Sequence, residues 1–197
     1  PPAQHLQLVI LYHLFRILGL IFMIGITESF LERFLRKKVI QRWALMMIIL
    51  GGGLGWIPVL IGRLDWLEWI PLSFYSPETF GFLAGYGIPH LTFSRGLLFL
   101  GVLKIMDGRG ARSGAAAGIF WLVMALFQPL NLAVAWLVTG GYGVSLLLLD
   151  WLPAWKPFET DRFSTRKQLL SIFWALGITL PVMIYYGWMS QTGTFSS

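Results

Sequence analysis

The stretch from Leu6 to Thr27 has the sequence LQLVILYHLFRILGLIFMIGIT, and it decides the fold class. Arg16 is the only residue within it that is charged at neutral pH. An α-helix needs about 20 mostly apolar residues to cross roughly 30 Å of hydrocarbon, and this stretch provides them. It therefore predicts a membrane-spanning helix.

The composition of the whole chain agrees with a membrane environment. Of the 197 residues, 56% are hydrophobic and 12% are charged, and the mean hydropathy is +0.70. Soluble domains carry about 25% charged residues, so this chain has too few to cover an ordinary water-facing surface. Many of its 10 Trp, 15 Phe and 6 Tyr residues flank apolar runs, as is typical of side chains at the headgroup level of a bilayer.

Further apolar runs predict an all-α, polytopic transmembrane helix bundle that forms a single domain over residues 1–197. At about 20 residues per crossing, about six spans are expected, near 6–27, 43–62, 89–106, 113–127, 130–152 and 168–189. A long acidic and aromatic segment separates the second span from the third. Ser76 and Pro77 predict the start of a short interfacial helix there, extending to about Tyr86. We expect Gly85, Gly87 and Pro89 to break it before the third span.

The basic residues favour one orientation in the membrane. They gather in alternate connections, and the positive-inside rule places those connections in the cytoplasm. The N- and C-termini of this chain then lie on the outer side of the plasma (inner) membrane. A net charge of +6 could suggest nucleic acid in a soluble protein, but topology explains it here, so no nucleic-acid partner is predicted. The expected partner is the bilayer, and the basic loops are Arg33–Arg42, Arg109–Arg112 and Lys156–Lys167.

The ends and the cysteine content add two expectations. The chain begins with Pro, and no basic segment precedes a short apolar run, so no signal peptide is predicted. We expect the chain to be an internal fragment of a longer protein. Cysteine is absent, which excludes disulfides and thiolate chemistry within this chain.

Arg16 is the first candidate for a functional residue, because a charge inside a span costs roughly 2.5–3.5 kcal/mol on insertion scales. His13 lies three residues earlier, on the same face of the helix. The alternative is structural: Arg16 extends its side chain to the interface, or pairs with a helix outside this chain.

A second group of candidates lies on the predicted outer side. His90 follows Pro89 and can accept a proton, and Arg95 can hold a phosphate oxygen bidentately. Glu78, Asp65 and Glu68 lie in the preceding outer segment, where they would face a polar headgroup substrate. The alternative is again structural: His90 caps its helix, Arg95 neutralises Glu78, and the helix dipole favours the Glu78 carboxylate.

Other patterns indicate packing rather than chemistry. Gly51–Gly55 lacks the preceding strand and the Lys-Ser/Thr of a phosphate loop, so close packing or a hinge is favoured. Ala115–Gly118 is typical of helix packing through small residues. Three scattered His residues do not form a zinc motif, and no nucleophile elbow is present. No metal site or cofactor is predicted.

Several stretches resemble a group of uncharacterised bacterial polytopic membrane proteins, which look like GT-C glycosyltransferases. The resemblance implies transfer of a sugar from a lipid-phosphate donor, such as a polyprenyl-phosphate sugar, on the outer membrane face. It implies that Arg95 or Arg16 holds the lipid phosphate, and that His90 or Glu78 contacts the sugar or the acceptor. The catalytic carboxylate of that pattern lies in the first outer loop, which would precede Pro1. The resembling stretches are Tyr12–Arg16, Gly51–Trp56, Ser76–Phe80, Pro89–His90 and Tyr185–Trp188.

Two other functions are consistent with the same residues. A transporter or flippase would use discontinuous helices near Gly87–Pro89 and Gly51–Gly55. A non-catalytic assembly subunit would pair its buried charges with partner helices. The residues themselves leave open whether the chain is an enzyme.

Overall fold

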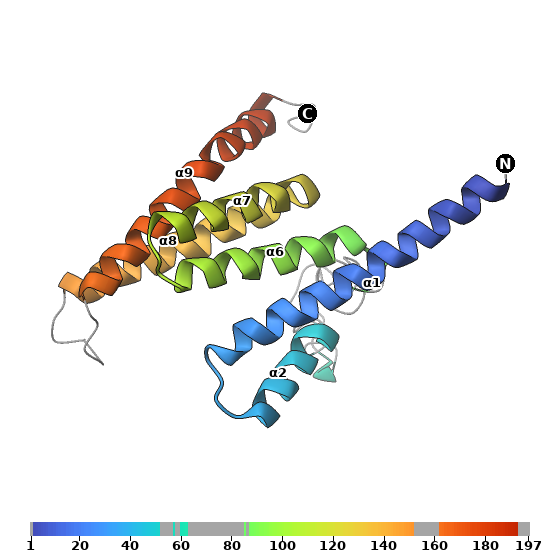
Figure 1. Ribbon diagram of the computed structural model, residues 1–197, viewed down its shortest axis with the longest axis horizontal. Helices are drawn as coiled ribbons and strands as arrows, with labels where there is room; N and C mark the ends of the chain where they lie inside the picture. The colour runs from blue at the N-terminus through green and yellow to red at the C-terminus, as the bar shows by residue number, and fades with distance from the viewer. Residues whose placement is uncertain are drawn as a thin grey trace. The chain divides into compact units, whose positions relative to one another are not determined.

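The computed structural model describes residues 2–51, 57, 60–62, 85, 87–151 and 162–192 (Figure 1). Within these residues the chain is α-helical apart from short connections, and no strand occurs. The prediction of an all-α fold is confirmed. The described helices are α1 (Pro2–Glu32), α2 (Lys38–Leu50), α6 (Pro89–Met106), α7 (Ala111–Phe127), α8 (Pro129–Trp151) and α9 (Arg162–Thr192).

Three of the described helical segments are long and apolar enough to cross a membrane: His5–Glu32, Pro129–Leu148 and Thr165–Thr192. The segment Ala111–Phe127 is apolar but shorter. Large apolar side chains along these helices stay exposed, for example 79% of Leu137. Contiguous apolar surface of this extent is not stable against water, and hydrocarbon is the medium that covers it. The apolar helices thus associate this chain with a membrane.

The helix bounds follow local sequence signals. The helix α6 has the bounds that the sequence predicts for the third span, 89–106. The end of α7 at Phe127 and the start of α8 at Pro129 also agree closely with the predicted spans. The N–H of Asn131 donates to the Gln128 carbonyl (3.2 Å), so the predicted tight turn is confirmed. The first helix continues beyond Thr27, where the Ser29 hydroxyl donates to the Gly25 carbonyl (2.9 Å) and so has an intrahelical partner.

Two helix ends differ from expectation. The second helix begins at Lys38 and stops at Leu50, because Gly51 is extended and its N–H makes the last bond, to the Met47 carbonyl. The sequence predicted that Gly85, Gly87 and Pro89 together would break the chain before the third span; the break falls at Ile88, directly before Pro89, whereas Gly85 and Gly87 are helical. A residue before proline is driven out of the helical region, so Pro89, rather than the glycines, determines this boundary.

The remaining expectations for the outer segment concern Ser76, Pro77 and the helix from Pro77 to Tyr86, and these lie outside the described residues.

The chain divides into two compact units, residues 1–96 and 97–197, which are described separately.

In the first unit, α1 runs parallel to the first turns of α6. The Tyr12 hydroxyl donates to the Gly87 carbonyl oxygen (2.7 Å), and further along both segments the Phe22 ring abuts Gly96. A methyl group on Gly96 would lie 2.5 Å from that ring, so the glycine permits the close approach. The second helix returns beside α1, and the Gln41 amide donates to the Leu35 carbonyl (2.5 Å) to hold the connection.

In the second unit, α7 packs most extensively on α9 through small residues. A methyl group on Gly114 would lie 2.2 Å from the Ser171 carbonyl oxygen, and one on Gly118 would lie 2.9 Å from the Ile178 Cβ. Ala175 is fully buried in the same interface. Small residues let helix backbones approach closely where no hydrophobic effect drives them together. The packing role predicted for Ala115–Gly118 is confirmed at Gly118.

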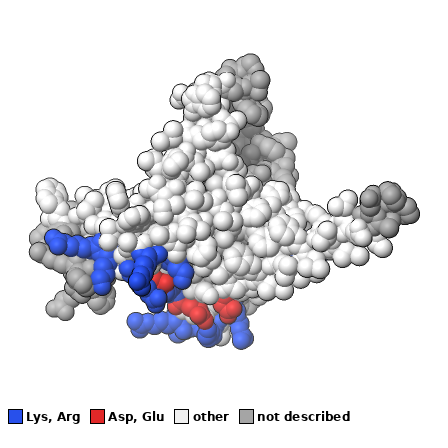
Figure 2. Space-filling view, turned by 45° about the horizontal axis from the view of Figure 1, so that its top comes forward, with Lys and Arg blue, Asp and Glu red and all other residues white. Residues whose placement is uncertain are grey.

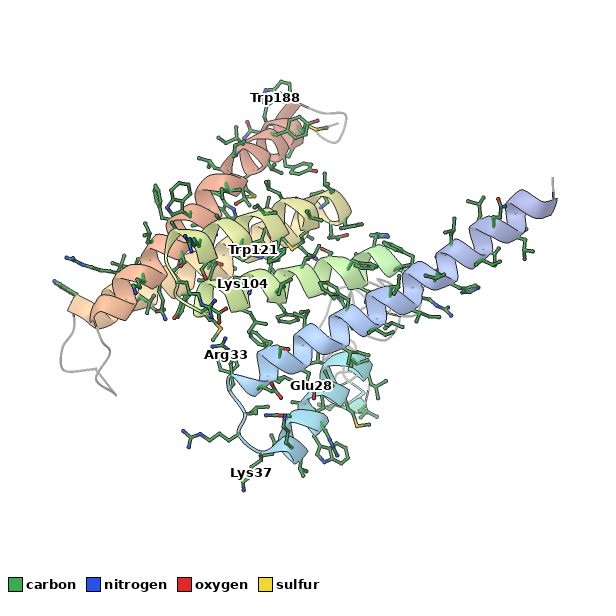
Figure 3. The ribbon with its side chains drawn as sticks, viewed as in Figure 1. Glu28, Arg33, Lys37, Lys104, Trp121 and Trp188 are labelled. Atoms are coloured by element: carbon green, nitrogen blue, oxygen red, sulfur yellow. The ribbon has the colours of Figure 1, made fainter. Side chains whose placement is uncertain are left out.

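The largest fully buried side chain is that of Trp121 on α7. Its indole N–H donates to the Leu98 carbonyl (3.3 Å), and its ring occupies the space above Gly101, where a methyl group would lie 2.1 Å from Nε1. Figure 3 shows Trp121 between α6 and α7, whereas Trp188 projects from the far part of α9. Gly101 and Trp121 thus fix the pairing of the second half of α6 with α7.

A hydrogen bond between side chains joins α8 and α9. The Trp136 indole N–H donates to the Thr179 hydroxyl oxygen (2.8 Å), and this hydroxyl donates in turn to the Ala175 carbonyl (3.0 Å). Pro181 follows inside α9 and has no N–H to donate to the Gly177 carbonyl. The intrahelical ladder of α9 is therefore interrupted just beyond its contact with α8.

Candidate functional site

The described candidate residues all lie in the first unit. His13 and Arg16 are on α1, and His90 and Arg95 are on the first turns of α6. The remaining candidates, Asp65, Glu68 and Glu78, lie outside the described residues.

One aromatic contact brings the two pairs onto neighbouring turns. Phe15 lies between His13 and Arg16 in the sequence, and its ring stacks on that of Phe93 with centroids 4.4 Å apart. Phe93 in turn lies between His90 and Arg95. The contact therefore places the turn that carries His13 and Arg16 beside the turn that carries His90 and Arg95.

The α1 side of this site is anchored at Tyr12. Its hydroxyl is bonded to the Gly87 carbonyl, and its ring meets the His13 ring edge-on with centroids 5.5 Å apart. The His13 side chain is exposed, whereas that of Arg16 is partly buried. Tyr12 and Arg16 are four residues apart, so both lie along the face of α1 that approaches α6.

The α6 side begins where Pro89 opens the helix. The Ile88 carbonyl accepts the Leu91 N–H (3.1 Å), and His90 is exposed in this first turn. Arg95 is partly buried one and a half turns later, and Ser94 beside it is fully buried. The imidazole of His90 is thus accessible, and the guanidinium of Arg95 extends from a closely packed part of the helix.

The arrangement has cationic character. The sequences from Tyr12 to Gly19 and from Gly87 to Gly96 contain no carboxylate, but together carry two arginines and two histidines. A guanidinium is the side chain best suited to hold a phosphate with two parallel hydrogen bonds. An imidazole can take or give a proton near neutral pH. The described residues of the site are thus of the types that bind anions and transfer protons.

Sequence reasoning assigned no role to Tyr12, Thr92 or Ser94. Tyr12 could have been identified from the sequence, because it lies next to His13 and four residues before Arg16. Thr92 and Ser94 could have been identified from their position between two candidate residues in an otherwise apolar helix. Both side chains are fully buried, and the Thr92 hydroxyl donates to the Ile88 carbonyl at 3.4 Å. These residues support the site rather than face a ligand.

Charged side chains gather where helices end, while the helix flanks seen in Figure 2 are almost free of charge. In the second unit, the Ser171 hydroxyl donates to the Gly110 carbonyl (2.9 Å), so the α6–α7 connection lies against the first part of α9. The basic residues of two connections therefore lie at one end of this unit: Arg109, Arg112, Arg166 and Lys167. The positive-inside rule predicts that basic connections such as these share one side of a membrane.

Within the part of the chain that the structure describes, no three His, Asp or Glu side chains lie close enough to hold a metal ion. Comparison with protein families, curated proteins and solved structures finds no match for this chain.

Proposed function

We propose that this chain is the membrane part of a glycosyltransferase, which moves a sugar from a lipid-phosphate donor at the outer face of the plasma membrane. The observation that carries the proposal is the Phe15–Phe93 stack, which brings Arg16 and Arg95 onto neighbouring turns. Two guanidinium groups beside an apolar, lipid-exposed helix suit a ligand that has a phosphate and a long hydrocarbon chain.

The depth of the site supports an outer-face substrate. At 1.5 Å per residue, Arg16 lies about 25 Å along the helix from Arg33 in the basic connection. If that connection lies in the cytoplasm, Arg16 falls in the outer part of a hydrocarbon core about 30 Å thick. The parallel direction of α1 and the start of α6 gives His90 the same outer position, since α6 begins there.

Each residue then has a chemical role. Arg16 and Arg95 hold the donor phosphate and stabilise the charge that develops on it as the bond from the sugar C1 to the phosphate oxygen breaks. His90 accepts the proton of the acceptor hydroxyl that attacks C1. His13 lies at the rim, where Tyr12 orients it. We propose Glu78, Asp65 and Glu68 as further contacts for the sugar or the acceptor.

The arginines can be tested by transfer activity. In membranes that contain the full protein and a radiolabelled polyprenyl-phosphate sugar, Arg16→Ala and Arg95→Ala should each lower the release of label from the lipid fraction about 10- to 100-fold. This corresponds to the loss of one charge-assisted hydrogen-bonding partner, about 1.5–3 kcal/mol. The matched control is Arg112→Ala, which removes an exposed arginine in the first turn of α7 and should leave transfer unchanged.

The possible outcomes separate the functions. Transfer that survives Arg16→Ala, Arg95→Ala and His90→Ala removes these residues from the mechanism. Protein-dependent uptake of the labelled lipid into liposomes without a covalent product indicates a transporter or flippase. If neither transfer nor uptake occurs and the cellular phenotype survives all three substitutions, the chain has an assembly role.

The orientation can be tested separately, because the chain has no cysteine. In intact cells, a membrane-impermeant maleimide should label Gln128→Cys in the α7–α8 turn. It should label Arg36→Cys only after the membrane is permeabilised, because Arg36 belongs to the basic connection. The reverse pattern would place the termini of this chain in the cytoplasm and contradict an outer-face site.

A further inference from the structure

The face of α2 that turns away from α1 carries an open groove of about 290 Å³, whose described lining is Val39, Arg42, Trp43 and Met46. These positions follow the i, i+3, i+4, i+7 spacing, so they form one stripe along the helix. Val39 is 66% exposed and Trp43 is 64% exposed. Gln41, by contrast, is buried and bonded back to Leu35. The second helix therefore presents this stripe outward.

Two of the three basic residues next to the groove make no ion pair with a described residue. Lys38 is paired with Glu32, but Lys37 and Arg42 make no ion pair within the described part of the chain, and both are exposed. Figure 3 shows Lys37 projecting from the connection between α1 and α2. The basic end of the groove is thus available to an anion.

If α2 runs along the bilayer normal, the order of its side chains matches the layers of a lipid. At 1.5 Å per residue, Trp43 lies about 7.5 Å along the helix from Lys38, and Met46 lies about 12 Å along it. Basic residues at the membrane surface attract anionic headgroups, indole rings collect just below them, and apolar side chains meet the acyl chains. The order of Lys37, Arg42, Trp43 and Met46 follows these layers.

We propose that this groove binds one anionic phospholipid from the leaflet that contains the α1–α2 connection. Lys37 and Arg42 hold the headgroup phosphate on either side of Val39, the Trp43 indole lies against the glycerol region, and an acyl chain extends along Met46. A lipid is the occupant because the groove combines apolar side chains with Arg42, and neither Arg42 nor the nearby Lys37 makes an ion pair with a described residue. The proposal is independent of the glycosyltransferase assignment.

Native mass spectrometry of the purified full chain can measure the site. With added phosphatidylglycerol, we expect one lipid to remain bound under conditions that strip phosphatidylcholine. Arg42→Gln should lower the bound fraction about five-fold, the order expected for one basic residue at a membrane surface. The matched control is Arg112→Gln, which removes an exposed arginine of α7 and should leave binding unchanged. Equal loss in both variants, or equal retention of both lipids, would overturn the site.

A second measurement does not depend on removing a charge. In vesicles of brominated phosphatidylglycerol, Trp43 should be quenched more than in brominated phosphatidylcholine, and the difference should disappear in Trp43→Phe. Replacement of Trp188, which is exposed on α9, serves as the control and should leave the difference intact. Quenching that is the same for both lipids in the unmodified protein would contradict selective binding, whatever the stability of the Arg42 variant.

Discussion

Replacing Trp121 with alanine should lower the free energy of unfolding in detergent by about 3–5 kcal/mol, the range for truncating a fully buried tryptophan. The side chain is 0% exposed, and its indole N–H is bonded to the Leu98 carbonyl. Because hydrocarbon surrounds the protein, the loss comes mainly from unfilled contacts and the broken hydrogen bond rather than from exposure to water. Titration with sodium dodecyl sulfate, followed by far-UV circular dichroism, measures the change.

Trp188→Ala provides the matched control for this experiment. Trp188 is 62% exposed, so its removal leaves no cavity and should change the free energy by less than about 0.5 kcal/mol. Similar losses in the two variants would mean that Trp121 does not have the packing described for it. Gly101→Ala should reproduce part of the Trp121 effect, since the added methyl group would lie 2.1 Å from the indole nitrogen.

Gly114→Ala should separate α7 from α9 and lower the free energy of unfolding by about 2–3 kcal/mol, in the range for overpacking a close contact. The added Cβ would meet the backbone of Ser171, at 2.2 Å from its carbonyl oxygen, and a backbone cannot rotate away as a side chain can. The same detergent titration measures the loss.

Gly177→Ala, on α9 itself, should have the opposite sign. No atom lies within 4 Å of the position that its Cβ would occupy, so the better helix propensity of alanine should raise stability by up to about 1 kcal/mol. If both alanines stabilise the protein, the α7–α9 interface is looser than described.

The sequence was most informative where one residue determines a local outcome. Pro89 and Pro129 mark the starts of α6 and α8, because proline is accepted in the first turn of a helix and excludes the preceding residue. The apolar composition of residues 6–27 was sufficient by itself to predict a membrane-spanning helix. The break expected from Gly85, Gly87 and Pro89 occurs directly before Pro89, whereas the two glycines stay helical, because glycine permits a break without requiring one.

The contacts between helices that assemble the candidate site cannot be predicted from the spacing of residues in the sequence. His13 and Arg16 could be placed on one helix face, and His90 and Arg95 on another, but nothing local indicates that Phe15 stacks on Phe93. That contact joins residues far apart in the chain, and it follows from how whole helices pack. The role of Tyr12 was missed for the same reason, since its partner is the backbone carbonyl of Gly87.

The interruption of α9 at Pro181 divides the helix into parts that resist bending differently. Before it, Ser171 and Ala175 are fully buried, and displacement there would disturb the contact with α7. After it, Trp188 is largely exposed, and Tyr186 reaches the Ala125 carbonyl at 3.5 Å. The turns of α9 before Pro181 are therefore held by close packing on α7, whereas the described anchor of the turns after it is the Tyr186–Ala125 hydrogen bond.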